Sequence, residues 1–142
     1  MKFSLSLLAL CLGVLSVQAA PEYGAVTVSK VISVYDGDTF RVDIDSLPPI
    51  VGKNIPIRLN GVDTPEIRGK CKYEKDLAIK ARDFVRNKLA NAKEIKLNNL
   101  QRGKYFRVVA NVMVDGVNLE QELLDNELAY NYTGGKKSSW CD

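Results

Sequence analysis

Acidic side chains cluster in two short segments of the sequence that could together bind a cation. The first segment is Asp36-Gly37-Asp38-Thr39, and the second, residues 58–66, ends in Asp63-Thr64-Pro65-Glu66. Carboxylates at this density repel one another unless a cation or a substrate lies among them. Taken singly, the first segment is typical of a turn and the second of a helix cap. Two interpretations therefore stay open: one cation site shared by both segments, or ordinary turn and capping residues.

The sequence contains no histidine, and this absence narrows the possible chemistry. It excludes Ser-His-Asp triads, paired-histidine ribonucleases and zinc sites with histidine ligands. Proton transfer would fall to carboxylates, lysine or tyrosine, and a bound metal should be a hard ion with oxygen ligands. Arg58 and Arg107, at predicted strand positions, could be surface residues or ion-pair partners when they are considered alone.

Alternating apolar residues predict the strands that must position these side chains. The predicted strands cover residues 25–34, 39–44, 55–60, 94–100 and 105–114. Asp36-Gly37 is suited to a tight turn between the first two strands. Apolar residues at helical spacing predict an amphipathic helix over residues 73–92 and a short helix over residues 119–128. Residues 46–54, with two prolines and a glycine, are typical of a long hairpin loop.

The order of these elements predicts a fold class. Three strands, a helix, two strands and a second helix fit a mainly β protein with helices: a five-stranded OB-fold Greek-key β-barrel plus two helices. In such a barrel the two acidic segments can open on the same rim. The architecture often binds nucleic acid, but a fold does not settle a function.

The first residues have the pattern of a secretory signal peptide. Lys2 is followed by a largely apolar run, residues 3–17, and then by small residues at Ala19 and Ala20. We predict a signal peptide over residues 1–19 and a single domain over residues 20–142. The alternative is an uncleaved membrane anchor, although the run is shorter than the roughly 20 apolar residues a spanning helix needs. We therefore expect a secreted or periplasmic protein with no membrane contact after cleavage.

Cleavage at this position removes Cys11 and leaves Cys71 and Cys141. An exported chain with two cysteines suggests one disulfide. The alternative is two independent thiols.

Three motifs, taken in order, resemble the staphylococcal-nuclease-like (thermonuclease) family. They are Asp36-Gly37-Asp38-Thr39, Arg58 with Asp63-Thr64-Pro65-Glu66, and Lys104-Tyr105-x-Arg107 before Asp115-Gly116. The resemblance covers about residues 26–132. It implies a Ca²⁺-dependent endonuclease, a phosphodiesterase that hydrolyses DNA and RNA to 3′-phosphorylated products. No stable protein partner is implied, and we expect a monomer.

The same resemblance implies a role for each site residue. Asp38 and Asp63 would bind Ca²⁺ through their side chains and Thr64 through its main-chain carbonyl, with Asp36 supporting the site. Glu66 would act as general base, or orient the attacking water, while Arg58 and Arg107 stabilise the charge that builds on the phosphoryl oxygens. Substrate contacts are expected from Lys104, Tyr105, Tyr130 and Tyr132.

The chain departs from the family pattern in three places. Phe106 stands where many relatives have glycine, the loop over residues 46–54 looks long, and the C-terminal helix of the best-known member is replaced by residues 134–142. We hypothesise that a Cys71–Cys141 disulfide replaces that helix by tying the tail to the segment after Glu66.

Two other function classes would explain part of this pattern. A non-catalytic OB-fold module that binds nucleic acid would be expected to lose the acidic and arginine positions, all of which are present. An exported calcium-binding structural domain would explain the acids but not Arg58 and Arg107.

Overall fold

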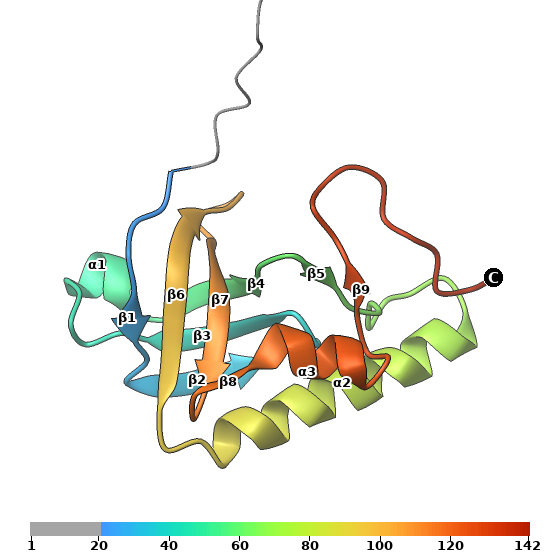
Figure 1. The fold of residues 1–142 in the computed structure, drawn as a ribbon, viewed down its shortest axis with the longest axis horizontal. Coiled ribbons are helices and arrows are strands. Elements are labelled where there is room, and N and C mark those ends of the chain that lie inside the picture. The colour runs from blue at the N-terminus through green and yellow to red at the C-terminus, as the bar shows by residue number, and fades with distance from the viewer. Residues whose placement is uncertain (1–20) are drawn as a thin grey trace, which may run out of the picture.

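The computed structural model describes residues 21–142, and the predicted signal peptide, residues 1–19, lies outside this range. The elements are β1 (Val26–Thr27), β2 (Lys30–Val34), β3 (Thr39–Asp43), α1 (Pro49–Gly52), β4 (Ile55–Leu59), β5 (Val62–Asp63), α2 (Lys72–Ala90), β6 (Ile95–Arg102), β7 (Val108–Val114), β8 (Val117–Asn118), α3 (Leu119–Asp125) and β9 (Tyr130–Asn131) (Figure 1). None of the helices within residues 21–142 is both long and apolar enough to span a bilayer.

The main sheet curls into a barrel, so the protein is mainly β with an OB-type architecture. Its strand order is β1-β6-β7-β4-β3-β2, and β8 pairs with β7. The contact between β4 and β7 is parallel, whereas β3 pairs with both β2 and β4 in antiparallel fashion. β1 pairs with β6 at one end of this strand order, and β2 pairs with β3 at the other end. The chain that runs from β1 to β2 therefore joins the two ends of the sheet.

Within the described residues the structure has more short elements than the sequence predicted. The expected strand over residues 25–34 splits because the chain changes partner: the Val28 amide donates to Ile95 at 2.9 Å and the Ser29 amide to Asp43 at 2.8 Å. The loop over residues 46–54 contains the four-residue helix α1. β5 and β9 form a separate two-stranded pair that the sequence did not predict.

The predicted strand over residues 105–114 begins only at Val108. Tyr105 and Phe106 have φ angles of 55° and 62°, which are left-handed rather than extended. The Arg107 amide donates to the Lys104 carbonyl at 3.1 Å, and the Gly103 amide donates to the Arg107 carbonyl at 2.7 Å. Residues 103–107 therefore form a tight turn, and the expectation that Phe106 lies on a strand was wrong.

Close packing against α2 fixes the position of the first acidic segment. The buried stripe of α2 includes Ala78, Ala81, Val85 and Leu89, at the spacing of one helix face. A Cβ atom on Gly37 would lie 2.8 Å from the Ala81 Cβ and 2.9 Å from the Thr64 Cγ2. Only glycine allows the turn to approach so closely, and this approach brings Asp38 against Thr64.

Glu120, in the first turn of α3, is a buried acid outside the acidic cluster. Its Oε1 accepts the Val112 amide at 2.8 Å, while Oε2 has no hydrogen-bond partner among residues 21–142. Burial raises the pKa of Glu120 from 4.5 to about 7, although hydrogen bonds from backbone amides oppose this shift. The folded protein therefore keeps this carboxyl protonated over a range in which the unfolded chain ionises it.

We expect Glu120→Gln to flatten the pH dependence of stability. The contribution of Glu120 to the free energy of unfolding is fully present below about pH 4.5 and is lost as the pH rises through about 7. The rise in pKa corresponds to roughly 3 kcal/mol. Urea unfolding at pH 4.5 and pH 8 should show wild type losing that much stability relative to Glu120→Gln. Parallel pH profiles for the two proteins would contradict this explanation.

Candidate active site

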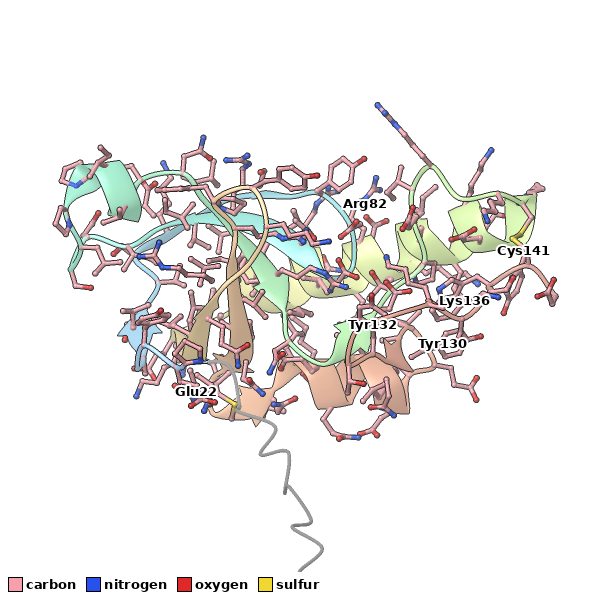
Figure 2. The ribbon with its side chains drawn as sticks, turned by 90° about the horizontal axis from the view of Figure 1, so that it is seen from above. Glu22, Arg82, Tyr130, Tyr132, Lys136 and Cys141 are labelled. Atoms are coloured by element: carbon pink, nitrogen blue, oxygen red, sulfur yellow. A yellow bond between two sulfur atoms is a disulfide. The ribbon has the colours of Figure 1, made fainter. Side chains whose placement is uncertain are left out.

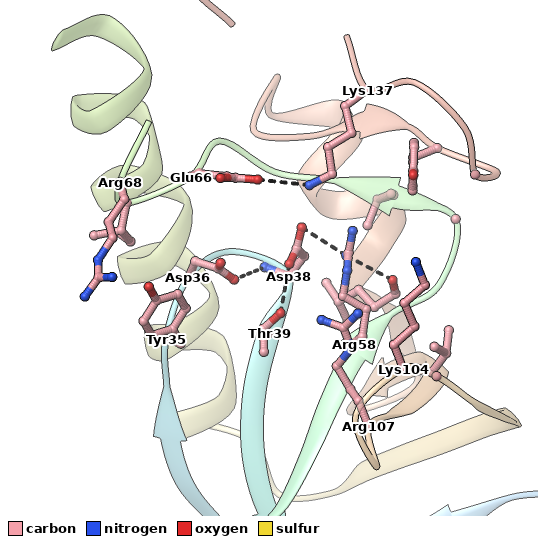
Figure 3. Close-up of a pocket in the computed structure, with 18 residues that line it drawn as sticks. Tyr35, Asp36, Asp38, Thr39, Arg58, Glu66, Arg68, Lys104, Arg107 and Lys137 are labelled. Atoms are coloured by element: carbon pink, nitrogen blue, oxygen red, sulfur yellow. Dashed lines mark hydrogen bonds and ion pairs between the residues drawn. The ribbon is translucent and has the colours of Figure 1, made fainter. Parts of the chain in front are cut away.

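A cleft of about 650 Å³ opens on the barrel rim where the two acidic segments meet (Figure 3). Its walls come from the turn after β2, the end of β4, the loop after β5, the 103–107 turn and the C-terminal tail. The polar and aromatic lining residues are Tyr35, Asp36, Asp38, Thr39, Arg58, Glu66, Arg68, Lys104, Arg107, Tyr132 and Lys137. Segments far apart in the sequence thus converge on one cleft.

Asp38 joins the two acidic segments through its buried side chain. Its Oδ2 accepts the Thr64 amide at 3.0 Å and lies 2.9 Å from Arg58 Nη1. Its Oδ1 accepts the Thr39 hydroxyl at 3.0 Å. The Leu59 amide also donates to the Asp38 carbonyl at 2.9 Å. These bonds place the carboxylate of Asp38 beside the backbone of Thr64.

Asp63 lies across from Asp38, and the guanidinium of Arg58 contacts both. Arg58 Nη2 is 3.6 Å from Asp63 Oδ1, and the Asp63 side chain is only 4% exposed. Lys137 Nζ lies 2.7 Å from the same oxygen. Within the described chain, the charge of the buried Asp63 Oδ1 is compensated by these two cationic side chains. The structure therefore brings Asp38, Asp63 and Thr64 together.

Asp36 is a half-buried acid that holds the turn. Its Oδ1 accepts the Asp38 amide at 3.1 Å. Burial, and then the neighbouring charge of Asp38, raise the pKa of Asp36 to about 7. Asp36 lines the same cleft, so it lies beside the Asp38–Asp63 pair and shapes the backbone that presents Asp38.

Glu66 reaches the open side of the cleft, where its side chain is 57% exposed and lies 3.1 Å from Lys137 Nζ. The loop that carries it is held by Glu74 at the start of α2. Glu74 accepts the Glu66 amide at 3.3 Å and the Lys70 amide at 2.8 Å. A Cβ atom on Gly69 would collide with the Glu74 carboxylate, so glycine is required where the loop wraps around it.

We expect Glu74→Ala to loosen the loop that carries Glu66. Two partly buried backbone amides would lose their acceptor. Each should cost less stability than the about 1–3 kcal/mol of a fully buried unpaired group, because water can reach it. Hydrogen exchange should speed up at the amides of Glu66 and Lys70, and urea unfolding should show the lost stability. Glu74→Gln keeps one acceptor oxygen and should give an intermediate result. Unchanged exchange at both amides would contradict the proposed restraint.

The two arginines lie side by side on one wall of the cleft, with Asp36 on the other side and Asp38 between (Figure 3). Arg58 also donates to the Leu59 carbonyl at 3.2 Å. Arg107 makes no ion pair with the described residues, and its buried Nε has no hydrogen-bond partner among them. Arg58 is therefore committed to the carboxylates, whereas Arg107 can receive an anion.

The sequence that forms this arrangement of acids and arginines is similar to known proteins. Residues 56–139 match the family model described as "Staphylococcal nuclease homologue". The chain belongs to this family. It is also 34% identical over 101 residues to the thermonuclease of Staphylococcus hyicus, a match that covers 70% of this chain and 53% of the relative. The chain thus spans about half the length of this curated relative. The family suggested by the three motifs is confirmed.

In this staphylococcal nuclease homologue the four predicted substrate contacts fall into two groups. Lys104 and Tyr132 line the cleft. Tyr105 is 94% exposed at the tip of the 103–107 turn, and Tyr130 stacks on Trp140 with ring centroids 3.8 Å apart. Neither Tyr105 nor Tyr130 lines the cleft, so only the first two are in place to touch a bound molecule there.

The C-terminal tail of this nuclease homologue returns from β9 to the start of α2, as Figures 1 and 2 show. A disulfide joins Cys71 to Cys141, whose Cα atoms are 5.9 Å apart. Trp140, next to Cys141, is 7% exposed. The tail is thus tied to the segment after Glu66, in the position that the sequence analysis proposed.

Sequence reasoning missed Lys137, which the tail carries into the cleft. Burial acts to lower the pKa of Lys137, but hydrogen bonds to Asp63 and Glu66 outweigh this effect and raise it. Tyr35, which also lines the cleft, was missed as well. The tail has no periodic hydrophobic pattern, so apart from the expected disulfide at Cys141 nothing in the sequence indicated that Lys137 lies in the cleft.

Proposed function

We propose that the chain is an exported, Ca²⁺-dependent nuclease that hydrolyses DNA and RNA to 3′-phosphorylated products. The observation that carries this proposal is a cleft lined by both Asp38 and Arg107, a guanidinium that has no ion pair within the described residues. Asp63 lies just behind this lining, joined to Asp38 through Arg58. Membership of the staphylococcal nuclease family supports it. After loss of residues 1–19, the domain over residues 20–142 would act as a monomer, secreted or periplasmic.

The residues present fit a calcium ion. Asp63 Oδ1 is buried and compensated only by cations in the described chain, and Asp38 lies beside it. Hard cations such as Ca²⁺ prefer carboxylate and carbonyl oxygens in loose geometry. The side chains of Asp38 and Asp63 and the carbonyl of Thr64 would hold the ion, and Asp36 would support them. A bound Ca²⁺ would supply positive charge that polarises a phosphodiester.

The remaining roles belong to side chains of the cleft. Glu66, on the exposed side, would orient or deprotonate the attacking water. Arg58 and Arg107 would stabilise the negative charge that develops on the phosphoryl oxygens. Lys104 and Tyr132 would contact the phosphate and base of the substrate, and Tyr105 and Tyr130 could reach only a longer strand.

The proposal is tested by the release of acid-soluble nucleotides from DNA and from RNA. We expect release in Ca²⁺ and none with a chelator, and we expect Asp63→Asn to abolish the Ca²⁺-dependent release. Asp76→Asn is the matched control, because exposed Asp76 pairs with Lys72 on the outer face of α2. Nucleic-acid binding without any release in Ca²⁺ would instead favour the non-catalytic binding module.

A further inference from the structure

A lysine from the C-terminal tail reaches the centre of the carboxylate cluster. Lys137 Nζ lies 2.7 Å from Asp63 Oδ1 and 3.1 Å from Glu66 Oε1. It therefore bridges the residue proposed to bind the metal and the residue proposed to activate water. Figure 3 shows its side chain extending toward Glu66 across the mouth of the cleft.

The tail that carries Lys137 is anchored on both sides. On one side, Asp63 pairs with Tyr130 between β5 and β9, and the Tyr132 amide donates to the Gly61 carbonyl at 2.8 Å. On the other side, Trp140 stacks on Tyr130 and Cys141 is bonded to Cys71. A surface lysine on a free tail would gain little from an ion pair. Here the anchors hold the lysine near its partners.

The charge at this position must be compensated. Asp63 is only 4% exposed, and its Oδ1 has contacts from Lys137 and, at a longer distance, from Arg58 within the described chain. Asp38 and Glu66 add further negative charge to the same cleft. An ammonium group and a divalent ion cannot both contact one carboxylate oxygen without strong repulsion.

We propose that Lys137 is a built-in counter-ion that competes with Ca²⁺ for Asp63. This inference rests on the function proposed above. The ammonium stabilises the carboxylate cluster when no metal is bound, and Ca²⁺ must displace it to reach Asp63. Lys137 thereby sets the Ca²⁺ concentration at which the site fills. Because the disulfide-anchored tail holds Lys137 in place, this concentration depends on the tail.

The test is isothermal titration calorimetry with CaCl₂ on the wild type, Lys137→Met and Lys136→Met. Lys136 is exposed and lies next to Lys137 in the same tail, so its replacement removes the same net charge without touching Asp63. We expect Lys137→Met to bind Ca²⁺ about tenfold more tightly than wild type, and Lys136→Met to stay within about twofold of it. Equal affinities for the two variants would overturn the inference.

Thermal unfolding gives a second, independent measurement. In chelator, Lys137→Met should melt below Lys136→Met, because the carboxylates then repel one another without compensation. Added Ca²⁺ should raise the melting temperature of Lys137→Met more than that of wild type. Lys137→Gln, which also removes the charge, replaces the methionine variant if that protein does not fold.

The outcomes separate the two proposals. Ca²⁺ binding by wild type with no difference between the variants would overturn the role of Lys137 and leave the proposed function intact. Binding that appears only after Lys137 is replaced would support the competition. No Ca²⁺ binding by any of the proteins would overturn both the calcium site and this inference.

Discussion

Replacing Arg107 with alanine is expected to lower the rate of phosphodiester hydrolysis by roughly 10²-fold or more, the usual loss for a donor that stabilises transition-state charge. Folding stability should change little. Arg107 lines the cleft without an ion pair among the described residues, so its removal strands no partner. Steady-state hydrolysis of a labelled oligonucleotide and thermal unfolding measure the two effects.

Arg58→Ala should lose activity to a similar extent but should also lose stability. Arg58 lies between two buried carboxylates, at 2.9 Å from Asp38 and 3.6 Å from Asp63. Its removal leaves both without that counter-charge, and breaking a buried pair in this way is strongly destabilising. The two alanine variants should therefore differ in folding stability even though they lose activity to a similar extent.

Arg102→Ala is the matched control for both arginines, because Arg102 packs over Tyr23, 5.8 Å from its ring centre, and does not line the cleft. It should keep near-wild-type activity. Arg107→Lys keeps the charge but loses the forked donors, so an intermediate rate is expected. Full activity of the Arg107→Ala variant would contradict a charge-stabilising role for this arginine.

Removal of the disulfide is expected to have the largest effect on stability. Cys71 and Cys141 are 70 residues apart in sequence, and the chain-entropy model values the closure of such a loop at about 4 kcal/mol. The Cys71→Ser, Cys141→Ser double variant should lose stability of that order in urea unfolding. Serine retains a hydrogen-bond acceptor at position 71, where the cysteine caps α2 by accepting the Glu74 amide.

A reductant provides the control for the double serine variant. It should lower the stability of wild type toward that of the variant and leave the variant unchanged. Activity should fall along with stability, because the tail and the loop that carries Glu66 meet at this bond. Mass spectrometry that finds two free thiols in the unreduced protein would contradict the pairing.

Local pattern was sufficient to predict the main elements and the shared rim. The stripe that contains Ala78, Ala81 and Val85 follows helical periodicity, and α2 forms over nearly the expected residues. The acidic segments follow strands whose order implies a barrel, so topology places them on the same rim, and the close packing of Gly37 then brings them into contact. Asp38, Arg58 and Asp63 meet for this reason.

Tertiary contacts determine the structural features that the sequence pattern did not predict. The first strand breaks at Val28 and Ser29 because the chain changes its pairing partner there, which no local pattern encodes. Phe106 has strand propensity, yet the 103–107 turn holds it at a φ of 62°. Lys137 enters the cleft because a disulfide and an aromatic stack anchor the tail on which it lies.

The proposed function requires the acidic cleft to cleave phosphodiester bonds with Ca²⁺. Mass spectrometry of a single-stranded oligonucleotide incubated with the purified protein tests this most directly. We expect shorter fragments that end in 3′-phosphate, formed in Ca²⁺ and absent when Arg58 and Arg107 are both replaced by alanine. An oligonucleotide that binds the wild-type protein yet stays intact in saturating Ca²⁺ would contradict the proposed function.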